Sequence, residues 1–178
     1  MTFAVNLATV GSNATATGTL ITSGTAVAST SGTSIDFTSI PSWVKRITIM
    51  LVGMSTNGAS EYLIRMGASG GFETTGYAGV GVYITPTGLA TTSYTNGFNI
   101  SNGNSATTTV VSGSAVLNLQ SASTNTWTCV GQFAQVADAK GGLTMGSKAL
   151  AGTLTQVRIT TVNGTDTFDA GSINILYE

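Results

Sequence analysis

The feature that most constrains the fold is an alternation of apolar and polar residues that recurs along the chain between turn-forming residues. Two long alternating runs, 107–120 and 124–135, are joined by Ser121-Ala-Ser123, which predicts a β-hairpin. No segment carries apolar residues at the 3.6-residue spacing of an amphipathic helix. Many short strands with turn signals about every 8–12 residues predict an all-β chain, and we expect an antiparallel, jelly-roll-like β-sandwich.

The longest run of strand-forming residues lies just after Pro41 and has two different faces. Period two places an apolar set on the face that we expect in the core: Trp43, Ile47, Ile49 and Leu51. The second face combines Arg46 and Thr48 with four apolar residues that a solvated face would not carry: Val44, Met50, Val52 and Met54. We therefore expect these four residues to be covered by the N-terminal arm or by a second subunit.

The chain divides into an N-terminal segment, residues 1–33, and a sandwich domain, residues 34–178. The first segment has no charged residue and is rich in Thr, Ala, Ser and Gly. We expect an extended arm over 1–20 and a first strand near 25–30. Within the domain, Ser55-Thr-Asn-Gly58 is typical of a turn, so the run 61–66 is predicted to pair back on 43–53 as a hairpin.

Charged residues are unusually scarce, since they make up 7% of the chain and leave a net charge of −1. About 25% is typical of soluble domains. A neutral, hydroxyl-rich surface does not attract nucleic acid or acidic lipid, so we expect neither as a partner. Near-zero net charge also gives little protection against self-association, which favours a protein that works in an assembly. We find no run of about 18 apolar residues and no basic leader, so neither a membrane span nor a signal peptide is expected.

The residue inventory argues against catalysis. The chain has no histidine, which removes Ser-His-Asp and Cys-His arrangements and imidazole metal sites. The single cysteine, Cys129, alternates with Trp127 and Phe133 and is expected to be buried. Asp166 and Asp169 could serve a hydrolase or a bound cation, but aspartates beside turns more often accept backbone amides. We therefore expect no enzyme activity, no metal and no cofactor.

Aromatic residues gather between positions 62 and 98 and offer a possible glycan platform. Three of them lie in or beside glycine-rich segments, where binding residues tend to occur, and are the candidates for receptor or glycan contact: Phe72, Tyr77 and Tyr94. The other three are expected to lie in the core or between the sheets: Tyr62, Tyr83 and Phe98.

Two segments resemble a module of tail-fibre and other virion proteins of tailed bacteriophages. The first is Phe37-Thr-Ser-Ile-Pro-Ser-Trp-Val-Lys-Arg-Ile-Thr-Ile-Met50 with Ser55-Thr-Asn-Gly58. The second runs from Arg158 through Asn163-Gly164 to the C-terminal Ile-Asn-Ile-Leu-Tyr-Glu178. Together they bracket residues 34–178, whereas 68–150 matches less well.

The resemblance implies a non-catalytic, β-rich virion component that forms homo-oligomers, often trimers. We expect it on the particle surface, as a tail-fibre-type component or as a capsid decoration (cement) protein that contacts other virion proteins of the capsid or tail. The alternative is a lectin-like module for a host surface glycan in host attachment.

Overall fold

The computed structural model describes residues 21–100 and 107–178 as two β-sheets and one short helical turn. The extended arm predicted for residues 1–20 lies outside the described residues. Nine strands form the larger sheet: β1 (Thr22–Ser23), β2 (Val27–Ala28), β4 (Arg46–Thr56), β7 (Tyr77–Thr85), β8 (Gly88–Tyr94), β10 (Val111–Ser121), β11 (Thr126–Gln135), β12 (Lys140–Ala149) and β14 (Phe168–Tyr177). Five strands form the smaller sheet: β3 (Ser34–Phe37), β5 (Tyr62–Ala68), β6 (Gly71–Phe72), β9 (Phe98–Asn99) and β13 (Gln156–Thr161).

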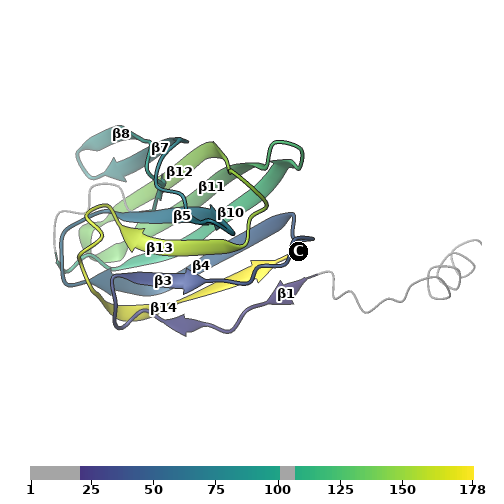
Figure 1. Ribbon diagram of the computed structural model, residues 1–178. Coiled ribbons are helices and arrows are strands. Elements are labelled where there is room, and N and C mark those ends of the chain that lie inside the picture. The colour runs from purple at the N-terminus through teal and green to yellow at the C-terminus, as the bar shows by residue number, and fades with distance from the viewer. Residues whose placement is uncertain (1–20, 101–106) are drawn as a thin grey trace, which may run out of the picture.

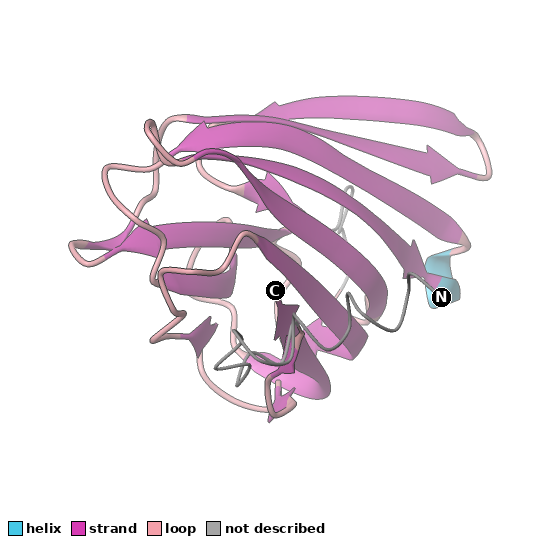
Figure 2. Cartoon of the chain, turned by 90° about the vertical axis from the view of Figure 1, so that its right-hand side faces the viewer, coloured by secondary structure: helices cyan, strands magenta, loops and turns pink. Residues whose placement is uncertain are grey.

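The two sheets pack against each other as a β-sandwich, which confirms the predicted fold class. The larger sheet has the order β1-β14-β4-β10-β11-β12-β7-β8, with β2 also paired to β14, and the smaller has β3-β13-β5-β6, with β9 paired to β5. Figure 1 shows β5, β13 and β3 as a layer across the strands of the larger sheet. The helical turn η1 (Val136–Asp138) joins β11 to β12 and stands at one end of the molecule in Figure 2. Within the described ranges no helix is long and apolar enough to cross a membrane.

The two hairpin predictions had different outcomes. β10 and β11 pair along their length, as the alternating runs 107–120 and 124–135 predicted. The predicted hairpin between 61–66 and 43–53 is wrong, because β5 pairs with β13 in the opposite sheet. Residues 57–61 therefore carry the chain from one sheet to the other, since β4 already has β10 and β14 as its two neighbours.

The core lies between the sheets and is built from the inward-facing residues of both. Ile47, Ile49 and Leu51 of β4 are buried, as the alternation predicted. They join a cluster that includes Ile64 of β5 and Ile159 of β13. Burying one such side chain stabilises the fold by about 1.5–3 kcal/mol, so the inward faces of a few strands supply most of the driving force.

Trp43 is a correction to the sequence prediction. It precedes the first residue of β4 and is 50% exposed, with its ring centre 5.8 Å from that of Tyr177. Its neighbour Val44 is buried instead, at 3% exposure. The alternation does not hold at Trp43 because this residue lies in a turn: Val44 N–H donates to the carbonyl of Pro41, and the regular strand begins only at Arg46.

A bulge in β4 explains why Met54 does not share a face with Val52. Gly53 has a φ of +63° and Gly171, on the neighbouring strand, has a φ of +90°. A side chain on Gly171 would collide with the carbonyl of Gly53, so the close approach of the two strands requires glycine at position 171, whereas glycine at position 53 is favoured by its positive φ. The extra residue shifts the register between β4 and its neighbours and turns Met54 into the core, where it is fully buried.

The segment before β3 runs along the edge of the larger sheet. β1 and β2 both pair with β14, and β2 lies within the region 25–30 predicted for a first strand. Gly24, just after β1, donates its N–H to the Ile175 carbonyl, and Ser29, just after β2, donates its N–H to the Gly171 carbonyl, so β14 holds both short strands. Residues 21–29 are therefore part of the sandwich.

Candidate functional site

Two of the three aromatic residues proposed for glycan contact are buried. Tyr77 and Tyr94 are 3% and 7% exposed, so they are not available to a ligand on the surface. Tyr77 begins β7 and Tyr94 ends β8, and both side chains point between the sheets rather than out of the loops that precede or follow them. The predictions for Tyr62 and Phe98 are confirmed, since both are almost fully buried, whereas Tyr83 is only half-buried.

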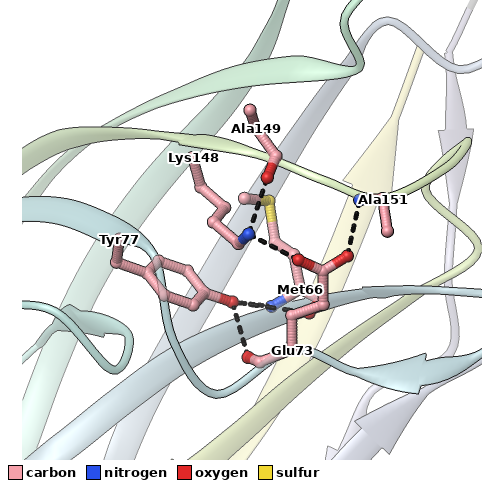
Figure 3. A network of polar contacts seen from close by, with 6 residues as sticks. All are labelled: Met66, Glu73, Tyr77, Lys148, Ala149 and Ala151. Carbon is pink, nitrogen blue, oxygen red and sulfur yellow. Dashed lines mark hydrogen bonds and ion pairs between the residues drawn. The ribbon is translucent and has the colours of Figure 1, made fainter.

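Tyr77 lies in a polar network that connects the two sheets (Figure 3). Its hydroxyl accepts a hydrogen bond from the Met66 amide at 2.8 Å and donates to the Glu73 carbonyl at 3.1 Å. Its ring packs edge-on against Phe98, with centroids 5.1 Å apart. Burial raises the pKa of Tyr77 to about 12. These contacts give Tyr77 a structural role, because its hydroxyl forms its hydrogen bonds with backbone groups of the same chain.

The same network contains an ion pair between Lys148 of β12 and Glu73, which follows β6 (Figure 3). Lys148 is 7% exposed in its side chain, donates to the Ala149 carbonyl at 2.6 Å, and lies 5.6 Å from the centre of the Tyr77 ring. The second carboxylate oxygen of Glu73 accepts from the Ala151 amide at 2.8 Å. Burial alone would raise the pKa of Glu73, but the hydrogen bonds from Lys148 and Ala151 hold it below its ordinary value. The pair therefore links the larger sheet to the smaller one.

Tyr94 is held by Glu61. The tyrosine hydroxyl donates to the Glu61 carboxylate at 2.6 Å, and the Asn99 side-chain amide donates to the same oxygen at 3.2 Å. Burial and this hydrogen bond both raise the pKa of Tyr94. The residue fixes the end of β8 against the smaller sheet.

Phe72 is the one candidate glycan residue that reaches the surface. It is half-buried and lines a hollow of about 260 Å³ beside the β5–β6 turn. The Arg158 guanidinium lies 4.1 Å from the centre of its ring. The remaining lining is small side chains and glycines, together with Glu73: Ala68, Ser69, Gly70, Gly71, Ala151 and Gly152.

The two aspartates near the C-terminus have structural partners. Asp166 accepts from the Ser60 amide at 2.9 Å and from the Asn163 side-chain amide at 2.6 Å, so it organises the turn between β13 and β14 as expected of a turn aspartate. Asp169 accepts from the Ser55 hydroxyl. In the described ranges no three acidic, cysteine or histidine residues come together as metal ligands would.

Cys129 is buried in the core, as predicted from its place between Trp127 and Phe133. Burial raises the pKa of its thiol, which disfavours the reactive thiolate.

The four residues proposed for subunit contact do not form one surface. Val44 and Met54 belong to the core of their own chain, the first because it precedes the strand and the second because of the bulge at Gly53. Met50 and Val52 do face outward, and Val52 is 66% exposed. They lie at one side of an extended surface, which we call the outer face and define by its exposed apolar residues: Val52, Val80, Ile84, Val130, Leu143 and Met145.

Most of the outer face was missed from the sequence. Val130 is 62% exposed and Ile84 53% exposed, although both lie in strands whose alternate residues are buried. The sequence feature that could have revealed it is the one that indicated Met50 and Val52, namely apolar residues on both faces of the same strand. It is weak in β12, where glycines dilute the alternation.

No known protein family matches this chain, and no curated protein shows significant sequence similarity to it.

Proposed function

We propose that this protein is a non-catalytic structural component of a tailed-bacteriophage virion, displayed on the particle surface as a homo-oligomer. The observation that carries the proposal is the outer face, on which four strands of the larger sheet, β4, β7, β11 and β12, present exposed apolar residues. Exposed apolar residues gathered on one face of a protein mark a contact surface, whereas exposed apolar residues that are scattered singly do not. The resemblance of residues 37–58 and 158–178 to phage virion modules supplies the setting in which such a surface is covered.

The particle location divides the proposal into two cases. A tail-fibre-type component is present in a few to a few dozen copies per particle, whereas a capsid decoration protein is present in hundreds. Quantitative mass spectrometry of purified particles that encode this chain distinguishes the two. If the chain is absent from purified particles, the proposed function fails.

The second candidate is a glycan-binding module, and the hollow beside Phe72 favours it. An aromatic residue beside a shallow surface hollow is a common element of carbohydrate sites, and Glu73 lines the same hollow. A glycan array probed with the wild-type protein and with Phe72→Ala tests this candidate. Trp43→Ala is the matched control, because Trp43 is an exposed aromatic residue outside the hollow. If no glycan binds, or if Phe72→Ala binds as well as wild type, this hollow is not a glycan site.

A further inference from the structure

The outer face is organised in rows that cross the larger sheet. One row follows the paired residues Val80, Met145, Val130, Val116, Thr48 and Leu176 from β7 to β14. The neighbouring row contains Val82, Leu143, Gln132, Ser114, Met50 and Asn174. The strands that carry these rows lie side by side in Figure 1. The two rows hold no charged side chain, and Arg46 lies at the margin, one position beyond Thr48 on the same side of β4.

The absence of charge in these rows limits what can cover them. A nucleic acid or an acidic lipid surface needs lysine or arginine side chains, and a strongly charged protein would lose hydration without gaining a counter-charge. The complementary surface is therefore another uncharged, partly apolar one. A second copy of this chain supplies such a surface, and a net charge of −1 opposes the approach of two copies only weakly.

The extent of the outer face fits a protein–protein interface. Six strands about 4.8 Å apart, each with four same-side residues about 6.8 Å apart, cover roughly 800 Å². A stable interface of standard size buries about 800 Å² on each partner. The face can therefore support association without a contribution from another surface.

The surface shape of the outer face resembles that of an interface core. A hollow of about 260 Å³ lies near its middle, beside the projecting side chain of Val130. Ser114 and Gln132 line this hollow together with Leu143, so hydrogen-bonding groups lie among apolar ones. An apolar residue that projects beside a partly apolar hollow is a pattern found in the cores of protein–protein interfaces.

We propose that the outer face of the nine-stranded sheet is the contact surface between copies of this chain. This proposal rests on the proposed function, because that function requires a homo-oligomer. What it adds is the assignment of the interface to particular residues. Val130 and Met145, paired across β11 and β12, lie at its centre.

The test is sedimentation of the full-length chain at concentrations of about 1 to 100 µM, a range in which interfaces of this size associate. Wild type is expected to form an oligomer. Val130→Asp is expected to raise its dissociation constant by about 30-fold or more, because a carboxylate would be buried at the centre of the contact. Val136→Asp is the control, since Val136 is 82% exposed but lies in the turn η1 beyond the strand ends. This variant is expected to associate as wild type does.

Thermal unfolding checks that Val130→Asp still folds, which is expected because Val130 is exposed in the single chain. A wild-type monomer across the whole range would overturn the proposal, as would an oligomer that Val130→Asp leaves intact. A monomer that binds a hydrophobic dye only after removal of residues 1–20 would show that this segment covers the outer face. That result would also overturn the proposal. The particle experiment is independent: a chain absent from particles that still forms this oligomer would refute only the proposed function.

Discussion

The outward faces of the two sheets are built from different chemistry. On the smaller sheet, Arg158 of β13 forms a two-pronged ion pair with Asp36 of β3, with nitrogen–oxygen distances of 2.7 and 2.6 Å. The same guanidinium packs on Phe72, and Arg65 of β5 donates to the Asn96 carbonyl at 2.8 Å. The larger sheet has no comparable charged pair across its central rows and presents valine, leucine, isoleucine and methionine instead.

This difference indicates how a chain with so few charges uses them. On the smaller sheet the charged groups find their partners within the same chain, so that face needs no further cover. Glu73 and Lys148 likewise satisfy each other between the sheets. Within residues 21–100 and 107–178 no segment covers the exposed apolar residues of the larger sheet, and a second copy is the proposed means of removing them from water.

The largest effect on the single chain is expected from Glu73→Gln. This variant removes the counter-charge of the buried Lys148 ammonium, which then has only neutral acceptors, the Ala149 carbonyl and the amide oxygen of the substituted side chain. Removing one partner of a largely buried ion pair is expected to lower the free energy of unfolding by about 2–3 kcal/mol. Chemical denaturation of the monomer measures this loss.

Arg46→Gln provides the control for Glu73→Gln. Arg46 pairs with Glu178 at 2.9 Å, but its side chain is 51% exposed. Its loss is therefore expected to cost less than about 1 kcal/mol. Equal losses in the free energy of unfolding for the two variants would contradict the view that the buried ion pair stabilises the fold more than the exposed one.

The ion pair between Glu73 and Lys148 also predicts that part of the stability is lost in acid. Because the pKa of Glu73 is lowered in the folded chain, the ionised form stabilises the fold at pH values above the ordinary pKa of 4.5. This contribution is lost as the pH falls from 4.5 through the lowered value. The free energy of unfolding of wild type should therefore fall more steeply over this range than that of Glu73→Gln. Parallel pH profiles would show that the pair contributes nothing to acid sensitivity.

A smaller effect is expected from Arg158→Lys on the smaller sheet. The Asp36 carboxylate raises the pKa of Arg158 through its hydrogen bonds, and a lysine cannot reproduce both of these bonds or the planar contact with Phe72. Both side chains of the pair are about one-third exposed, so we expect a loss of about 0.5–1 kcal/mol in the free energy of unfolding. In a double-mutant cycle with Asp36→Asn, a coupling near zero would show that the pair does not stabilise the smaller sheet.

Sequence patterns predicted the fold class and much of the core because period two directly reports which side of a strand is apolar. They did not assign strands to sheets: β5 and β4 are consecutive and both apolar, but a change of sheet leaves no mark in the alternation. The sequence of β12 shows little alternation because Gly141, Gly142 and Gly146 dilute the pattern. A side chain on Gly146 would collide with the backbone of β7, so this glycine reflects close strand packing.

Two of the three candidate glycan residues, Tyr77 and Tyr94, are buried for a related reason. Tyr77 and Tyr94 lie beside glycine-rich loops, and this proximity suggested surface positions. Their hydroxyls instead reach polar groups inside the sandwich, the Met66 amide for Tyr77 and the Glu61 carboxylate for Tyr94. A tyrosine carries its own hydrogen-bonding group into a core, so its polarity says little about exposure.

The smallest effect is expected from Val130→Thr on the outer face. The substitution keeps the branched shape that suits a strand and exchanges one methyl group for a hydroxyl. At 62% exposure in the single chain the hydroxyl remains in water, so the free energy of unfolding of the monomer should change by less than about 0.5 kcal/mol. The same substitution at Val157, which is fully buried in β13, should cost about 1–3 kcal/mol because the hydroxyl loses water. Denaturation below the association range compares the two variants. A large loss for Val130→Thr under these conditions would mean that the chain itself covers the outer face, and the contrast between the two sheets would then disappear.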